Sequence, residues 1–591
     1  MRKTIFLIAV LCLCFMSPVK AAGFVFNVST TFEVLDNSSV RATYDVSVTN
    51  ETAQPTPSSI DLPLVGDAKS ISAKYSDGKK ISYEVSEQTV TLKANQDNKG
   101  LNNTWGFELT YITDNFYDFG KTSLLNVPVL DFGDLNISKH TIILSSDLDL
   151  GLGTVRGPEA TSSDFVKGKQ QFRWVKNGKF NRQVGLWMGD QAVAEVSFTK
   201  EIKNSSWWWQ KQIVVLPPDN SQQQIIVDSI SPTPSSVSLD IDGNIIASYT
   251  LRPLQKKTIS YKVRALVNNV VYTAGDGDLT DLPEEVQKHT QTTDLWSGGE
   301  TSIKDSESIS KQLSSINTQV IKGKNVEPDY EARKALADKL VGEYRHHGFP
   351  ARTVLGISRD IGLGIEDEAL PHAWVEVYAP SFGWITVDPT LSINGQEFGS
   401  NDVTHIAIVI RGVNEDYPPE LLSSTSSTYL SEDIVFPEIS EANLSATNYV
   451  VLPGLSIQRI NISIPAGTAI DGTAVSINGL TQKLGSLAPF QKVGINRVGF
   501  LKDAFSSLTV TFGIGEGQIS NTIAVAQGPS NYMPMIGIIG LISLLSLTYY
   551  IFQKYHSKNT SKGKHAVVLT SEDKGEAIED KNLAKDIEDN K

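Results

Sequence analysis

The sequence predicts a multidomain, β-rich protein with one mixed α+β domain and one transmembrane helix near its C-terminal end. Stretches such as VRATYDVSVTN, residues 40–50, alternate apolar and polar residues, as half-buried strands do. Helical spacing is concentrated in the middle of the chain, where YEARKALADKLVGEYRHHG, residues 330–348, precedes further strands. An uncharged apolar run of 18 residues, 535–552, is long enough to span a bilayer. We therefore expect β-sandwich regions on both sides of a central α+β domain.

The N-terminal end has the pattern of a secretory signal peptide, predicted to be residues 1–21. Arg2 and Lys3 precede a short apolar run, and Val19-Lys20-Ala21 then places small residues at the spacing that a signal peptidase needs. The alternative, a buried first helix, is disfavoured by the basic flank and the cleavage site. The chain has two cysteines, Cys12 and Cys14, and both lie in this segment. The mature protein is therefore predicted to have no disulfide and no cysteine metal site.

Two β regions follow the signal peptide. Residues 22–203 contain strand patterns separated by turn signals, which predict an N-terminal β-sandwich domain. Residues 204–275 predict a second β region. In it, Asp240, Asp242 and Asn244 have part of the spacing of a calcium loop. The Asp-Gly pair and the lack of the later glutamate favour a hairpin turn instead.

Three consecutive tryptophans, Trp207, Trp208 and Trp209, open the second β region. Adjacent side chains on a strand cannot all face one way, so at least one indole is a candidate for exposure. Because tryptophans are mostly buried on average, we expect the run to pack between domains. The alternative is an exposed patch that stacks on glycans or faces a membrane.

The C-terminal part divides into four segments: a polar linker (421–433), a membrane-proximal β-sandwich (434–530), a transmembrane helix (533–552, with its apolar run at Met535–Phe552) and a charged, disordered tail (553–591). Four lysines and no acid occur in residues 553–564. The positive-inside bias then places the tail in the cytoplasm and the N-terminal ectodomain outside a cell membrane that the chain crosses once. The net charge of −14 argues against nucleic acid as a partner.

The stretch HAWVEVYAPSFGWITVD, residues 372–388, predicts an antiparallel hairpin in the central domain, residues 276–420. His372 begins one strand and Asp388 ends the next, so both side chains are expected at the same end of the hairpin. A carboxylate beside an imidazole fixes its tautomer and stabilises its charged form. This pair is the supporting part of a Cys-His-Asp nucleophilic site.

GFPARTVLGI, followed by HAWVEVYAPSFGWITVDPT and later VTHIAIVIRGVNEDYPPE, resembles the transglutaminase-like domain of the papain-like cysteine superfamily. The resemblance covers residues 279–419, about a quarter of the chain. It implies an α+β fold and an acyl-transfer site in which His372 and Asp388 match the catalytic pair. It also implies a groove for an extended peptide, with Trp374, Glu376 and Trp384 as its expected lining.

The family's nucleophilic cysteine has no counterpart. Counting back about 15 residues from Gly348, as the resemblance directs, gives Arg333. A guanidinium is a permanent cation without nucleophilic character, and it could instead pair with Asp388 or Glu376. The nearby hydroxyls of Tyr330, Ser358 and Ser381 do not occupy the nucleophile position.

Three functions remain open from the sequence. The first is a catalytically inactive surface protein whose central domain binds a peptide or protein. The second is an active acyl-transfer enzyme that uses a non-cysteine nucleophile or a partner. The third is a structural spacer at the cell surface. No cofactor or metal is predicted for any of them.

Overall fold

The computed structural model describes residues 23–35, 39–52, 59–93, 100–147, 153–271, 279, 282–304, 307–396, 398–420, 422–432, 434, 443–452, 455–477, 480–500, 508–514, 517–523, 525–527, 543–552 and 554. The predicted signal peptide, residues 535–542 of the predicted transmembrane run and nearly all of the tail lie outside these residues. Within the part of the chain that is described, no helix combines the length and the apolar character needed to cross a membrane.

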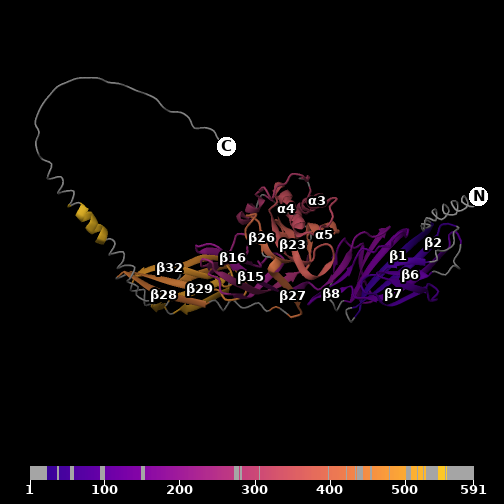
Figure 1. Cartoon of the computed structure of the whole chain (residues 1–591), viewed down its shortest axis with the longest axis horizontal. Helices are drawn as coiled ribbons and strands as arrows, with labels where there is room; N and C mark the ends of the chain where they lie inside the picture. Colours follow the sequence, from indigo (N-terminus) through magenta and orange to yellow (C-terminus); the bar gives the residue numbers. More distant parts are fainter. Residues whose placement is uncertain are drawn as a thin grey trace, which may run out of the picture. The chain divides into compact units, whose positions relative to one another are not determined.

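The first domain is built from three sheets (Figure 1). The largest has seven strands in the order β12 (Ser162–Val166), β13 (Lys169–Asn177), β10 (Ile137–Asp147), β1 (Phe24–Val34), β2 (Val40–Asn50), β7 (Thr104–Thr113) and β4 (Lys69–Tyr75). A four-stranded sheet contains β11 (Gly153–Arg156), β14 (Val184–Met188), β9 (Thr122–Val127) and β8 (Phe116–Phe119). A three-stranded sheet contains β3 (Ser59–Pro63), β6 (Thr89–Lys93) and β5 (Ser82–Ser86). Alternate residues of β1 and β2 are buried, as their sequence pattern predicts.

The second β region includes strands from outside its predicted limits. Its larger sheet has the order β17 (Gln223–Ser231), β20 (Lys256–Asn268), β15 (Gln191–Lys203) and β27 (Thr425–Leu430). Its smaller sheet contains β16 (Gln210–Leu216), β19 (Ile245–Leu251) and β18 (Ser236–Leu239). The predicted boundary puts β15 in the first domain, but this strand pairs with β20 and β27 of the second β region. β27 lies in the segment that was expected to be a linker. Sequence alternation identifies a strand but not its partner across more than 200 residues.

Two other features of this region bear on the sequence expectations. The loop between β18 and β19 is a turn in which Asp240 accepts hydrogen bonds from the backbone and side chain of Asn244, while Asp242 accepts from His289 across 2.7 Å. These carboxylates therefore already have protein donors. The expectation that Trp207, Trp208 and Trp209 pack between domains is wrong, because all three side chains are largely exposed.

The central domain places helices against a four-stranded sheet (Figure 1). Its helices are α2 (Glu284–Gln287), α3 (Ile309–Ile321), α4 (Tyr330–His346) and α5 (Pro389–Ile393), with 3₁₀ turns η3 (Lys288–Thr290) and η4 (Leu422–Ser424). The sheet order is β24 (Gly383–Val387), β23 (Ile365–Ala379), β22 (Ala351–Asp360) and β26 (Ile406–Arg411), and a small pair joins β21 (Val270–Val271) to β25 (Ser400–Asn401). α4 packs on β22 and β23, and α3 packs on α4 and α5.

Helix α4 begins and ends where the sequence indicates. Asp329 caps it by accepting a hydrogen bond from the backbone of Ala332, and Gly348 follows its end with a positive φ of 82°. The spacing of apolar residues in the sequence predicts a buried stripe of Ala332, Ala335, Leu336, Leu340 and Tyr344, and the observed buried face differs from it. Only the last two of these are fully buried, and Arg333, Ala337 and Val341 join them. The helix is therefore rotated so that Arg333 faces inward.

The C-terminal strands form two four-stranded sheets. One has the order β32 (Lys492–Phe500), β29 (Leu455–Ser463), β28 (Asn443–Leu452) and β35 (Val525–Gln527). The other has the order β31 (Leu480–Leu487), β30 (Ile470–Ile477), β33 (Leu508–Ile514) and β34 (Gly517–Ile523). By its contacts the chain separates into two compact units, and the described residues of the second are 446–452, 455–460, 495–500, 525–527, 543–552 and 554.

Candidate functional site

The hairpin of β23 and β24 brings His372 and Asp388 together as the sequence predicts. Val375 pairs with Val387 across the two antiparallel strands, so the start of β23 lies beside the residues that follow β24. His372 Nε2 is 2.8 Å from Asp388 Oδ2, and both side chains are buried. Asp388 also caps α5, since its Oδ1 accepts from the backbone N–H of Thr390 across 2.7 Å.

A second histidine, which the sequence did not single out, shares the same carboxylate. His405 Nε2 is 3.1 Å from Asp388 Oδ2, and His405 Nδ1 is 2.9 Å from Asp402 Oδ1. Burial opposes a charge on His405, but Asp402 and Asp388 outweigh it and raise the pKa of His405 to about 10. The protonated ring therefore donates from both nitrogens.

Asp388 is held as an anion by its two histidine neighbours. Burial alone would raise its pKa, but the charges and hydrogen bonds of His372 and His405 keep the pKa of Asp388 well below its usual range. Asp402 has a lowered pKa for a similar reason: the opposing contributions of His405 and Thr404 exceed the cost of burial. The sequence signal for this network was the short stretch from Asp402 to His405, inside the segment that resembles the family after its aspartate.

Arg333, which counting back from Gly348 aligns with the family's nucleophile, does not make the ion pair that we expected. Its guanidinium donates to the backbone carbonyls of Glu327 at 3.0 Å, Pro328 at 2.5 Å and Pro371 at 2.9 Å. Glu376 instead accepts from Arg352 Nε at 2.7 Å. Arg333 thus ties the loop before α4 to the residue before His372, and it is 3% exposed.

No hydroxyl among the described residues replaces the nucleophile beside His372. The Nδ1 atom of this ring, the nitrogen that faces away from Asp388, is buried and has no hydrogen-bond partner. Tyr330 donates to Glu420 across 2.6 Å, and Ser358 bonds with Thr404 at 2.9 Å. Ser381 lies in the exposed turn between β23 and β24. The imidazole has its orienting carboxylate but nothing to deprotonate.

Comparison with protein families agrees with this geometry. The family model of the transglutaminase-like superfamily matches residues 331–389, which include Arg333, His372 and Asp388. This segment is transglutaminase-like. No curated protein sequence matches the chain.

Similar solved structures are distant from this chain. A proposed cysteine protease from Cytophaga hutchinsonii is 12% identical, with 41% of this chain and 97% of that chain covered and a TM-score of 0.25. An M1 zinc metallopeptidase from Deinococcus radiodurans is 13% identical, with coverages of 31% and 44% and a TM-score of 0.19. Aminopeptidase A from Legionella pneumophila is 11% identical, with coverages of 35% and 24% and a TM-score of 0.22. This chain therefore spans less than half of the zinc metallopeptidase and less than half of aminopeptidase A. Structural likenesses with TM-scores this low carry no argument about its activity.

The three residues expected to line the groove of the transglutaminase-like domain are packed instead. Trp374 is buried against His405, with ring centroids 5.1 Å apart. Glu376 is buried in its pair with Arg352, and the Arg352 guanidinium lies 4.0 Å from the ring centroid of Trp384. These residues stabilise the sheet, and they do not line the cavity beside Arg333.

A cavity of about 410 Å³ opens at the start of α4 in the transglutaminase-like domain. Its wall combines apolar and polar side chains from α4, from the loop before it and from α5: Lys324, Asn325, Val326, Glu327, Ala332, Arg333, Ala335, Leu336, Lys339, Thr390 and Ile393. Thr390 directly follows the Asp388-Pro389 pair, so the cavity lies close to the site around Asp388.

Three atoms of the site are placed where they could hold a metal ion. His372 Nε2, Asp388 Oδ2 and His405 Nε2 lie within 4.8 Å of one another and are ligand types that zinc accepts. Each of them is already engaged in the hydrogen bonds described above, and protonated His405 has no lone pair for a metal. A metal would have to displace the proton that His405 shares with Asp388.

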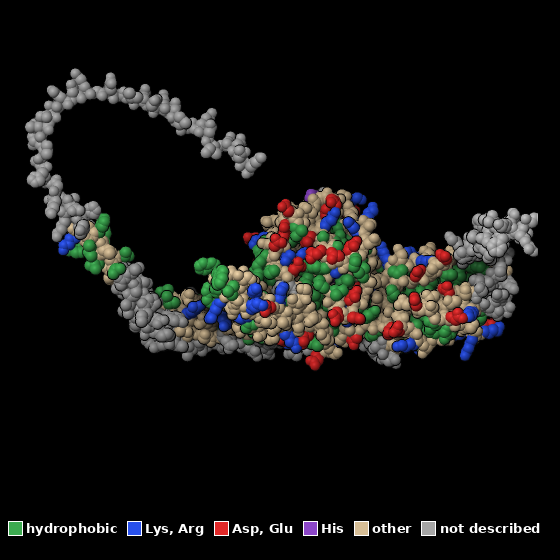
Figure 2. Space-filling model, viewed as in Figure 1, with side chains coloured by type: hydrophobic (Ala, Val, Ile, Leu, Met, Phe, Trp, Pro, Cys, Tyr) green, Lys and Arg blue, Asp and Glu red, His purple; other side chains and the backbone are tan. Residues whose placement is uncertain are grey.

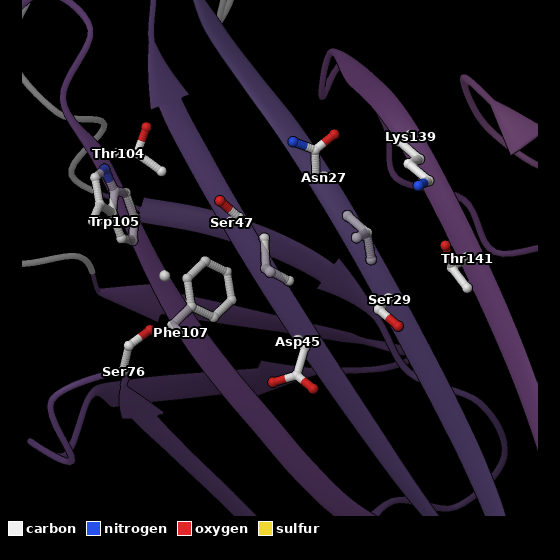
Figure 3. Close-up of a pocket in the computed structure, with 13 residues that line it drawn as sticks. Asn27, Ser29, Asp45, Ser47, Ser76, Thr104, Trp105, Phe107, Lys139 and Thr141 are labelled. Atoms are coloured by element: carbon white, nitrogen blue, oxygen red, sulfur yellow. The ribbon is translucent and has the colours of Figure 1, made fainter. Parts of the chain in front are cut away.

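A larger hollow, of about 640 Å³, lies on the polar face of the seven-stranded sheet (Figure 3). Asn27, Ser47 and Gly106 occupy paired positions on β1, β2 and β7, with Asp45 and Ser29 in the next row. These are side chains of the outward sheet face, and they form no catalytic arrangement of the kind seen around Asp388.

Proposed function

We propose that this chain is a cell-surface protein whose transglutaminase-like domain binds a peptide or protein segment and does not turn it over. The observation that carries the proposal is the position of Arg333. Three backbone carbonyls hold the guanidinium of this residue, which counting back from Gly348 aligns with the family's cysteine, and no hydroxyl or thiol of the described residues hydrogen-bonds the Nδ1 of His372. Without a nucleophile, the His372–Asp388 pair has no acyl-enzyme to form.

The cavity beside Arg333 supports a ligand of peptide character. Its apolar wall, with Leu336 and Ile393, suits an aliphatic side chain, and Asn325, Lys324 and Lys339 add hydrogen-bond donors. Pockets of this size accept one or two residues of an extended chain. The cell-surface location rests on the predicted signal peptide and on the apolar run Met535–Phe552, through which the chain would be anchored to the membrane.

A purely structural role is the second candidate, and buried contacts with the preceding domains favour it. Arg156 Nε of the first domain donates to Asp360 Oδ2 of β22 across 2.6 Å. Gln223 and Asn244 of the second β region each bond the backbone of β26, at Ala407 and Ile410. Such contacts would serve a domain whose task is to hold its neighbours in place.

The test for turnover uses the full chain purified in detergent, a dansylated glutamine-containing tetrapeptide and an alkyl amine. We expect neither amine incorporation nor ammonia release, for the native chain or for His372→Ala. Turnover by the native chain that is lost in His372→Ala would overturn the proposal and establish the enzyme.

Binding is tested with the same peptide by fluorescence anisotropy. Leu336→Arg fills the cavity, whereas Glu331→Arg places the same side chain on an exposed position of α4 that does not line it. Saturable binding by the native chain and by Glu331→Arg, with at least a tenfold loss in Leu336→Arg, supports the proposal. If no peptide in a panel of varied sequence saturates the native chain, the structural role takes its place.

A further inference from the structure

We propose that the loop between β15 and β16, which carries Trp207, Trp208 and Trp209, is a membrane-contacting loop that inserts into the interface of a bilayer containing anionic lipid. The three side chains are 78%, 80% and 63% exposed. Leu254, in the turn that faces the loop, is also exposed. An apolar cluster of this kind on a monomer surface marks an interaction site.

The loop holds these side chains in a fixed presentation. Asn204 is fully buried, and its Nδ2 donates to the carbonyls of Trp208 at 2.7 Å and Arg252 at 2.9 Å. Its Oδ1 accepts from the backbone and the hydroxyl of Ser206, at 2.9 and 2.8 Å. Leu254 N–H in turn donates to the Ser206 carbonyl across 3.3 Å. The single amide of Asn204 therefore fixes the backbone of the loop and the facing turn, in the arrangement that leaves the three indoles exposed.

The surface around the loop is basic. Residues 200–212 and 250–258 contain six lysines and arginines and one acid, in a chain whose net charge is −14. That acid, Glu201, is already paired with Lys256 at 2.9 Å. Figure 2 shows a hydrophobic knob at the place of β16, with lysine and arginine side chains beside it. Cationic side chains next to protruding apolar ones favour contact with anionic headgroups.

Tryptophan is the residue type that is best suited to this contact. Its ring is apolar and its N–H is polar, so it is enriched where a protein crosses the level of the headgroups. A glycan site would instead need polar side chains directed at the sugar, and the amide of the loop, on Asn204, is fully used within the protein. A second copy of this chain would bring two basic surfaces together, which is repulsive.

Fluorescence quenching in proteoliposomes tests the proposal on the full chain. The chain has nine tryptophans. The six outside the loop are buried or half-buried (Trp105, Trp174, Trp187, Trp296, Trp374 and Trp384). Lipids with brominated acyl chains quench indoles at bilayer depth, so the signal reports on the loop. We expect strong quenching in vesicles of phosphatidylcholine with about a third phosphatidylglycerol, and weaker quenching in phosphatidylcholine alone or at high salt.

Two variants separate the apolar and the charged contributions. Trp207→Gln/Trp208→Gln/Trp209→Gln should abolish most of the quenching, and Lys203→Glu/Lys211→Glu should reduce it several-fold at low salt without touching an indole. Phe165→Gln removes an equally exposed aromatic side chain from β12 of the first domain and should change nothing. Far-ultraviolet circular dichroism verifies that each variant is folded.

Two outcomes would overturn the proposal. One is an absence of quenching in anionic vesicles, or quenching that persists in the triple variant. The other is self-association of the native chain in detergent that the triple variant abolishes, without quenching in vesicles, which would assign the loop to contact with a second copy.

Discussion

His405 donates from Nε2 to Oδ2 of Asp388 across 3.1 Å, inside the core of the transglutaminase-like domain. This is the oxygen that also accepts from His372 at 2.8 Å. Asp388 therefore has two roles: it orients the remaining catalytic-type histidine, and it neutralises a buried cation. Asp402 Oδ1 lies 2.9 Å from Nδ1 of the same His405 ring, so the buried cation is held between two carboxylates. Through this second role of Asp388 the network is part of the folded core.

Replacement of His405 by glutamine is expected to destabilise the central domain by about 3–5 kcal/mol, because it leaves two buried carboxylates without their cation. The midpoint of urea unfolding, followed by the tryptophan fluorescence of the chain, measures this loss. His346→Gln is the matched control on an exposed position of α4 and should shift stability by less than about 0.5 kcal/mol. Equal, small effects of the two variants would show that the network adds no stability.

The stability that His405 provides depends on pH in a defined direction. Its folded pKa of about 10 lies above the unfolded value of 6.5, so its contribution is complete below pH 6.5 and is lost as the pH rises towards 10. Asp388 has a lowered pKa, so its contribution is present above pH 4 and is lost as the pH falls. Between pH 6.5 and 10, the thermal midpoint of the native chain should therefore fall more steeply than that of His405→Gln. Parallel curves would contradict a charged His405.

Chelation of metal ions is expected to leave stability unchanged. The three possible ligand atoms at His372, Asp388 and His405 are joined by hydrogen bonds, which a metal ion would have to displace. Differential scanning fluorimetry with and without EDTA, on protein purified without chelator, measures the effect. A drop of several degrees that zinc reverses would instead assign a bound metal to the site.

The hairpin of the site could be predicted because its information is local. His372 and Asp388 are separated by one turn, and the alternation of the two strands fixes their register. His405 could not be placed in the same way. His405 directly precedes the edge strand β26. It reaches Asp388 only because β26 pairs with β22, a strand about 50 residues earlier in the chain.

Composition also gave a misleading expectation for the three tryptophans. Average burial favours packing, yet one buried asparagine, Asn204, organises the loop so that the indoles face solvent. The inward face of α4 was missed for a similar reason. An arginine is not expected in a core, and Arg333 is accommodated there because three backbone carbonyls outside the helix accept hydrogen bonds from its guanidinium. Both cases depend on hydrogen bonds between segments that the pattern of apolar residues does not reveal.

The pair between Arg156 and Asp360 should couple the stability of the first and central domains. Both side chains are buried, and burial raises the pKa of Asp360 against the opposing charge of Arg156. Arg156→Leu should cost about 3–5 kcal/mol because it leaves a buried, unpaired carboxyl group. Asp360→Leu should cost a similar amount, and the double variant should cost clearly less than the sum of the two. Additive losses in thermal or urea unfolding would show that the two residues do not interact.

Arg333→Cys tests whether position 333 is the site of the lost nucleophile. A thiol there would lie at the start of α4, whose N-terminal end lowers a thiol pKa, on the inward face from which Arg333 reaches the carbonyl of Pro371, the residue before His372. We expect iodoacetamide to alkylate it with an apparent pKa well below the ordinary value of about 8.5. Cys12 and Cys14 are replaced by serine in all proteins of the series, so that one thiol is measured.

Glu331→Cys gives the matched control, because it places a thiol in the same first turn but on an exposed position. The helix end acts on both thiols, whereas His372 can act only on the one at position 333. Adding His372→Ala should therefore raise the alkylation pKa of the Arg333→Cys protein towards that of Glu331→Cys, and it should leave Glu331→Cys unchanged. If His372→Ala has no effect on either thiol, Arg333 does not occupy the position of the family's cysteine.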